Sequence, residues 1–183
     1  MLTDAFIDKN GLTIPPEHLC LALRNVCIPL AGDRLSNLLQ DDRVIAERMD
    51  EIMIEIELCI SLVYKPLLHH LQRILSTEAD LLGVWSSLLA VMEHLLCNET
   101  THQSAEDDGE LVDSRGMTPG QLRRSTKELA SEHLRNAVMV LIAIGVIKSA
   151  PESEGDISAM TWKSVSKMEF CKDQAEEWKQ SAV

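Results

Sequence analysis

Three side chains of metal-binding type lie close together in the sequence, at His94, Cys97 and His102. Structural zinc sites use about four ligands in a tetrahedral arrangement, and no fourth ligand follows at a suitable spacing. Cys97 also closes the apolar face of a predicted helix, where cysteine acts as a small hydrophobic residue. The pattern therefore favours packing over zinc binding, and we expect no metal or other cofactor.

Two neighbouring histidines, His69 and His70, invite a catalytic interpretation. Neighbours on an α-helix point about 100° apart, so the two rings would not converge on one target. We expect one ring at the surface and the other packed at a helix junction. Glu51 and Glu55 lie four residues apart, which is typical of the solvated face of a helix. Since the sequence also lacks a GxSxG elbow and a phosphate-binding glycine loop, we expect no catalytic residue in this chain.

The composition disfavours several classes of function. There are 17 basic and 29 acidic residues, and the formal charge of −12 disfavours nucleic acid as a partner. The most apolar stretch, residues 136–147, is far shorter than the roughly 20 residues that span a bilayer, so no transmembrane segment is expected. Five cysteines are scattered without a CxxC pair, and residues 1–10 lack an apolar signal. Together these features predict a cytoplasmic protein.

The elements that would position these residues are predicted to be helices, because aromatic residues make up only 3% and apolar residues recur every three or four positions. Pro15-Pro16-Glu17 marks the start of a first helix. We expect that helix to end or kink at Pro29 and a turn to follow at Gly32-Asp33. A long helix is expected from Asp41-Asp42, with a kink at Pro66.

The second half of the chain is predicted to contain two more long helices. The first covers residues 81–96, with Trp85 on its apolar face. Residues 98–118 then contain six acids and one base, which is typical of a disordered loop. Thr118-Pro119-Gly120-Gln121 has the capping-box pattern that begins the second helix, and Gly145 suits its end. After Pro151 the chain is polar, with Trp162 as its bulky apolar anchor, and the pattern allows a short helix near residues 171–179.

These elements predict an all-α fold in which antiparallel helix pairs stack as an α-solenoid of the HEAT or armadillo type, with a closed bundle as the alternative. The expected parts are a repeat region over residues 1–97, an acidic disordered loop over 98–118, a long helix over 119–150, and a polar tail over 151–183. The first helix is apolar on more than one side, for example at Leu21 and Val26. This pattern indicates a missing neighbour and favours a fragment of a longer protein, with a shortened chain that dimerises through this face as the alternative.

Four stretches occur together in a particular order: Ile28-Pro29-Leu30, Leu82-Gly83-Val84-Trp85 leading to Met92-Glu93, Glu132-His133-Leu134-Arg135-Asn136 leading to Gly145-Val146-Ile147, and Gly155-Asp156 followed by Thr161-Trp162. This order resembles the large Arf guanine-nucleotide exchange factors of the Golgi brefeldin A-resistance and GNOM type. The resemblance covers nearly the whole chain. It departs from the family at the acidic loop, where relatives have a lysine-rich connection.

The resemblance implies a C-terminal helical-repeat segment, downstream of the catalytic Sec7 domain and similar to the region called HDS3. Proteins of this family activate Arf GTPases and support vesicle-mediated transport. The Sec7 motif has no counterpart in this sequence, so the chain alone is expected to be no enzyme. The implied partners are other domains of an exchange factor and Arf-pathway proteins. The implied location is cytoplasmic and peripheral to Golgi or early secretory membranes.

The polar end of the chain is where we expect partner or membrane contacts. Trp162 lies outside the main predicted helices, with Lys163 and Lys167 beside it, and this is locally the least acidic part of the sequence. Trp85, by contrast, is expected in the core. The alternative to the exchange-factor interpretation is a freestanding α-solenoid adaptor that binds another protein in a groove.

Overall fold

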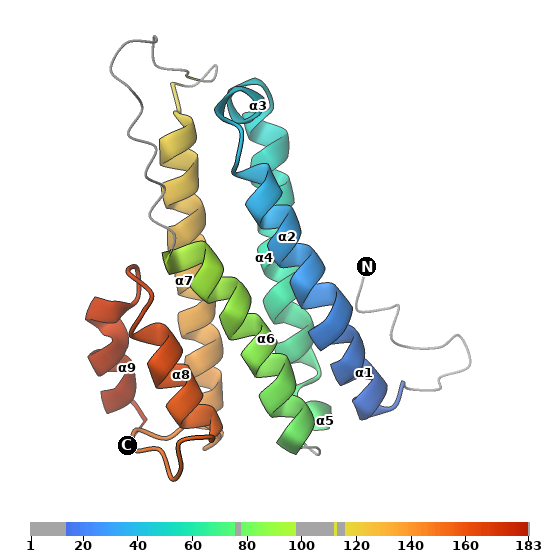
Figure 1. Ribbon diagram of the computed structural model, residues 1–183, viewed down its shortest axis with the longest axis vertical. Coiled ribbons are helices and arrows are strands. Elements are labelled where there is room, and N and C mark those ends of the chain that lie inside the picture. The colour runs from blue at the N-terminus through green and yellow to red at the C-terminus, as the bar shows by residue number, and fades with distance from the viewer. Residues whose placement is uncertain (1–13, 76–77, 98–111, 113–115, 183) are drawn as a thin grey trace.

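The computed structural model describes residues 14–75, 78–97, 112 and 116–182, and all the regular elements in these ranges are helical. Figure 1 shows their order. The helices are α1 (Pro16–Ala22), α2 (Ile28–Leu38), α3 (Asp42–Glu47), α4 (Met49–His69), α5 (Leu71–Ile74), α6 (Glu78–Cys97), α7 (Pro119–Ala143), α8 (Ile157–Val165) and α9 (Ala175–Gln180). The all-α prediction is confirmed.

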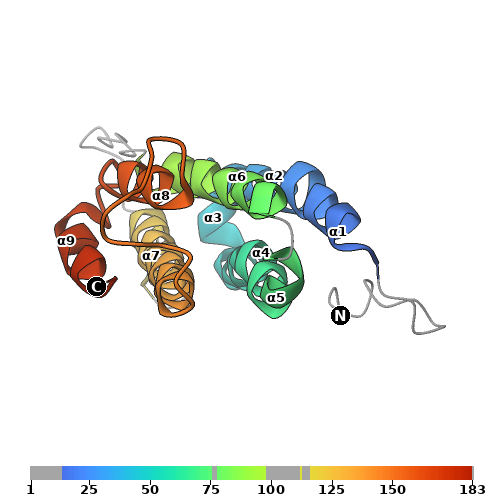
Figure 2. The same ribbon diagram turned by 90° about the horizontal axis from the view of Figure 1, so that it is seen from below.

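The long helices form two layers, which are seen end-on in Figure 2. One layer contains α1 with α2, then α6, then α8, and the other contains α4, α7 and α9. Neighbours within each layer are in contact, as are the two layers at α2 with α4 and at α6 with α7. The chain passes up through the first layer and down through the second three times (Figure 1). This stack of antiparallel pairs is solenoid-like, as predicted.

The first helix does not end near Ile28. A π-helical turn over Leu23–Cys27 joins α1 directly to α2, so the predicted turn at Gly32-Asp33 is wrong and both residues lie inside α2. A proline ring normally clashes with the carbonyl four residues earlier. The wider π turn immediately before Pro29 relieves that clash, so the helix continues.

The predicted long helix from Asp41-Asp42 is divided into two. Asp41 caps α3, and its carboxylate accepts hydrogen bonds from the backbone amides of Arg43 (2.9 Å) and Val44 (3.3 Å). Arg48 has non-helical dihedral angles and separates α3 from α4. From there α4 continues through Pro66 to His69.

Both predicted ends of α7 are confirmed. The Thr118 hydroxyl accepts from the Gln121 amide at 3.2 Å, and the Gln121 side chain accepts from the Thr118 amide at 2.9 Å, which completes the capping box. At the other end Gly145 has φ of 76°, and the amide of Val146 donates to Leu141 across the last turn. A residue with left-handed backbone dihedral angles ends a helix, and glycine adopts this conformation without steric cost. The helix therefore stops before Gly145.

The C-terminal segment, predicted as a polar tail with a short helix, packs against α6 and α7. It folds as α8, a 3-10 turn over Lys172–Gln174, and α9. Most of its charged residues are exposed, while Thr161, Trp162, Val165, Met168 and Trp178 are among its buried residues. The short helix expected near residues 171–179 corresponds to the 3-10 turn and α9.

The structure bears on the predicted acidic loop and on membrane spans only for the residues that it describes. Of the acidic segment 98–118, only Val112 and residues 116–118 are described, so its predicted disorder lies outside the described residues. Among the described helices, none combines the length and the apolar character needed to cross a membrane.

Candidate interaction surfaces

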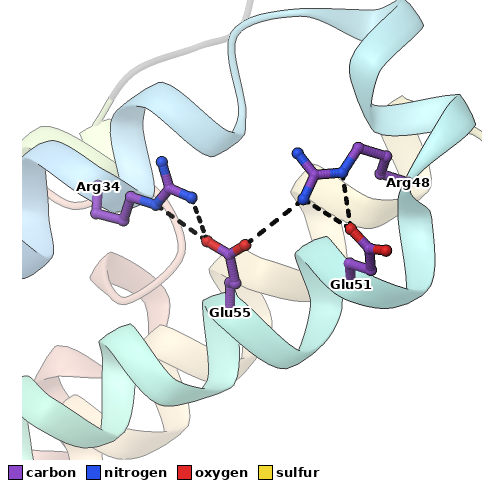
Figure 3. Close-up of polar contacts among 4 residues, drawn as sticks. All are labelled: Arg34, Arg48, Glu51 and Glu55. Carbon is purple, nitrogen blue, oxygen red and sulfur yellow. Dashed lines mark hydrogen bonds and ion pairs between the residues drawn. The ribbon is translucent and has the colours of Figure 1, made fainter.

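Glu51 and Glu55 of α4 are engaged in ion pairs (Figure 3). Glu55 accepts from the guanidinium of Arg34 on α2, with its Oε2 3.0 Å from the Arg34 Nε. Arg48 donates to Glu51 through its Nε at 2.7 Å and lies 4.0 Å from Glu55. These four exposed or half-exposed side chains neutralise one another and link α2 to the start of α4. Their role here is structural.

The aspartates before α4 also have structural partners. Asp42 forms an ion pair with Arg123 of α7, whose side chain is only 7% exposed. The Nε of Arg123 donates to the carbonyl of Leu39 at 2.9 Å. One buried arginine therefore holds the end of α2 and the start of α3 against α7.

The histidines and cysteines are dispersed rather than assembled. His70 is buried and His69 exposed, as predicted, with the two rings edge to face at 4.8 Å between centroids. The Cys97 thiol donates to the carbonyl of Lys167 at 3.2 Å, and His94 is exposed. Among the described residues no three side chains of metal-ligand type come together. Burial raises the pKa of the Cys97 and Cys171 thiols, which favours their protonated, unreactive form.

The tryptophans that carry the family resemblance pack in the core. The indole Nε1 of Trp85 donates to the Thr161 hydroxyl at 2.8 Å, and that hydroxyl donates to the carbonyl of Ile157 at 2.6 Å. Trp162 is 5% exposed and donates to the carbonyl of Lys148 at 2.8 Å. The bonds fasten α8 to α6 and to the loop after α7. A contact role for Trp162 does not fit this position, because its ring is already covered.

The other residues of the resembling stretches divide between core and surface. Met92 and Leu134 are fully buried, whereas Glu132 and Asn136 are exposed on α7. Glu93 is partly buried and lies 3.4 Å from Lys167. The buried members of these stretches therefore stabilise the helix stack, whereas Glu132, Arg135 and Asn136 present exposed side chains on α7.

The positive charge of the lysines near Trp162 is partly neutralised by neighbouring glutamates. Lys163 and Lys167 are exposed, but Lys167 pairs with Glu93 and Lys172 pairs with Glu169 at 2.5 Å. Two of the three charges are therefore balanced locally. The arrangement gives little support to binding of an anionic membrane at this end.

The outer edge of the first helix pair carries exposed apolar side chains, namely Leu21, Val26 and Leu30. Leu30 is 66% exposed. It stands two positions before Gly32, whose α carbon faces Val91 of α6, so Leu30 points to roughly the opposite side of α2. We call Leu21, Val26 and Leu30 the N-terminal edge. It is the apolar face that the sequence predicted for the first helix.

A cavity of about 510 Å³ lies where α2, α6 and α7 meet. Its walls include Leu35, Val91 and Leu95, together with Arg123 and Lys127. Arg123 is engaged as described above, and the Lys127 ammonium lies 5.6 Å from the centre of the Phe170 ring. The cationic groups of this cavity therefore already have partners within the fold.

A second hollow, which we call the α4–α7 groove, opens between α4 and α7 with a volume of about 410 Å³. Met53, Ile54, Leu122 and Leu129 are among the residues that line it. The sequence does not reveal this site, because the helical spacing places Met53 on the same apolar stripe as Ile52 and Ile56. The available signal was Ile54 and Leu58, two apolar residues four positions apart on the side opposite that stripe.

Comparison with known proteins supports the resemblance. The family described as the GBF1-like, tetratrico peptide repeat region matches residues 1–170. No curated protein and no solved structure matches the chain. The matched range includes α1 to α8 and hence the Trp85–Thr161 contact that joins α6 to α8. The chain therefore belongs to the GBF1-like tetratrico peptide repeat family, a GBF1-type segment of the Arf exchange-factor group.

Proposed function

We propose that this chain is a non-catalytic scaffold segment of a Golgi-type Arf guanine-nucleotide exchange factor, located after the Sec7 domain and similar to the HDS3 region. It supports Arf activation and vesicle-mediated transport by binding other domains of the exchange factor or Arf-pathway proteins. The protein acts in the cytoplasm, at the periphery of Golgi or early secretory membranes.

The family match is the observation that carries this proposal, since it spans residues 1–170. The N-terminal edge adds support. Helical-repeat proteins cover the apolar face of each repeat with a neighbour, and Leu21, Val26 and Leu30 lack such a cover among the described residues. A preceding repeat of the same exchange factor would supply it.

The native size of the protein tests the proposal. An antibody raised against this segment is used on lysate of the source cells. A band several times larger than 20.4 kDa is expected, because the segment would be joined to a Sec7 domain. A band near 20 kDa would contradict the proposal and favour the freestanding adaptor.

The non-catalytic part of the proposal has its own test. The purified chain is added to Arf loaded with a fluorescent nucleotide, and a Sec7 domain serves as the positive control. Release at the spontaneous rate is expected with the chain alone. Release as fast as with the Sec7 domain would overturn the assignment.

A further inference from the structure

We propose that the α4–α7 groove binds an amphipathic helix from a partner protein, one that carries an apolar stripe flanked by lysine or arginine. The proposal concerns a surface to which nothing above assigns a role. It holds whether the chain is part of an exchange factor or freestanding.

The lining of the groove is suited to apolar side chains. Met53, Ile54 and Ile56 contribute from α4, and Leu122 and Leu129 from α7. Thr126 also lines the groove, but its hydroxyl donates to the carbonyl of Leu122 in its own helix at 2.8 Å. The hydroxyl is therefore satisfied internally, and a partner can cover this wall without leaving the Thr126 donor unpaired.

Exposed apolar residues extend the groove along α4. Ile54 is 62% exposed and Leu58 is 57% exposed, and the two lie four positions apart on one face. A single exposed leucine is normal on a protein surface. Two large aliphatic side chains in register, beside an apolar hollow, form a continuous patch of the kind that marks an interaction site.

The length of the groove matches two turns of a guest helix. Along α4 the groove extends from Asp50 to Glu57, which is two helical turns or about 10 Å. Along α7 the lining extends over the same number of residues, from Leu122 to Leu129. Both helices run in the same direction (Figure 1). A guest helix lying between them would place side chains at positions i, i+4 and i+7 in the hollow.

The negative charge around the groove favours a partner helix with basic residues beside its apolar stripe. Glu57 lines it, and the ion pairs of α4 described above use Glu51 and Glu55 instead of Glu57. The chain as a whole carries −12. Lysine or arginine beside the apolar stripe would be attracted to this rim, whereas an acidic helix or an anionic membrane would be repelled.

The experiment uses the 183-residue chain and two synthetic 18-residue peptides. Both peptides have leucines at i, i+4, i+7 and i+11 and alanines between them, and they differ only in carrying lysine or glutamate on the flanks. Binding is measured by fluorescence anisotropy of the labelled peptides. The binding site is mapped by amide chemical shifts of the isotope-labelled chain.

The lysine peptide is expected to bind, with shifts concentrated in residues 50–58 and 122–129. Ile54→Glu should weaken it at least about tenfold, because a buried aliphatic contact is lost. Ile144→Glu is the control, since Ile144 is an exposed aliphatic residue at the far end of α7 that does not line the groove, and it should bind like the unaltered chain. Glu57→Lys should reduce the preference for the lysine peptide over the glutamate peptide.

Three results would overturn the proposal. Equal binding of the two peptides would remove the charge argument. Unchanged binding to Ile54→Glu, with its helical circular dichroism retained, would place the site elsewhere. A wild-type dimer in sedimentation that becomes monomeric in Ile54→Glu would show that a second copy of the chain, rather than a partner helix, occupies the groove.

Discussion

The hydrogen bond between Trp85 and Thr161 joins residues 76 positions apart inside the core, and both belong to stretches that carry the family resemblance. Thr161→Val keeps the shape of the side chain but leaves the indole N–H of Trp85 buried without its acceptor. An unsatisfied buried donor costs about 1–3 kcal/mol. We expect the free energy of unfolding, measured by urea titration, to fall by this amount.

A double-mutant cycle separates the hydrogen bond from packing. Trp85→Phe removes the donor, so adding Thr161→Val to it should cost less than Thr161→Val alone, by about 1 kcal/mol. Costs that simply add would mean that the hydrogen bond contributes nothing. Trp85→Ala should be more costly, about 3–5 kcal/mol relative to the unaltered chain, because it leaves a cavity.

Tyr64 offers the opposite case, a buried polar group that costs stability. Its hydroxyl finds no hydrogen-bond partner among the described residues, while its ring stacks on His133 at 5.6 Å. Tyr64→Phe keeps the ring and removes the unpaired hydroxyl. The variant should be as stable as the original chain or more stable, by up to ~1 kcal/mol at pH 8.

The pH dependence of the Tyr64 variant has a definite sign. Burial raises the pKa of Tyr64 well above its ordinary value of 10.0. The folded chain therefore holds the proton when the unfolded chain has lost it, and stability declines as the pH rises beyond about 10. Tyr64→Phe lacks this loss, so its advantage in urea titrations should grow between pH 8 and pH 10.5. A constant or shrinking difference would contradict the assignment.

The close approach of α2 and α6 in the first layer depends on one glycine, Gly32. A Cβ atom at Gly32 would lie 2.8 Å from a methyl group of Val91, where α2 meets α6. Alanine normally favours a helix interior, but forcing this contact should outweigh the gain and lower stability by about 1–2 kcal/mol. Gly83→Ala is the contrasting case, because its neighbour is the flexible side chain of Arg24 at 3.1 Å. It should raise the melting temperature.

A smaller residue at Val91 tests whether this contact causes the loss of stability in Gly32→Ala. In a chain that already carries Val91→Ala, Gly32→Ala should lose most of its cost, because the clashing methyl groups are gone. If the penalty stays the same, the close approach of α2 and α6 is not its source.

The ends of a helix were predicted well where the residues that determine them are close together in the sequence. The ends of α7 depend on Thr118, Gln121 and Gly145, and all three acted as expected. Pro29 was expected to end or kink the first helix. The helix continues instead, because a π turn precedes the proline, and no local sequence pattern indicates that turn. The family stretches placed Trp85 correctly, but only the tertiary contact with Thr161 shows what its indole does.

The surface was harder to predict than the core. Trp162 was expected as a contact residue because the sequence around it is polar, yet the loop after α7 covers it and accepts its N–H. The α4–α7 groove joins residues about 70 positions apart, Met53 and Ile54 with Leu122 and Leu129. A pattern within one helix shows which residues share a face, but it does not show which faces remain uncovered.

At the scale of the whole molecule, the last helix pair completes both layers. In the first layer α8 packs on α6, and in the second α9 packs on α7. Repeat proteins draw much of their stability from such neighbour contacts. Since Trp162 and Trp178 are both buried in this pair, residues 151–183 should be essential for folding rather than an appendage.

Ending the chain at residue 150 tests this dependence. The truncation removes two buried tryptophans, each worth about 3–5 kcal/mol when cut to alanine, against a total stability of about 5–15 kcal/mol for a typical domain. We expect its thermal unfolding, followed by circular dichroism, to be broad and shifted far down. The full chain with Lys163→Ala and Lys167→Ala is the control, and it should stay within ~0.5 kcal/mol of the original because both side chains are exposed. A truncated chain that unfolds cooperatively at the original temperature would mean that α6 and α7 need no covering pair, and the α8–α9 pair would then be an independent attachment.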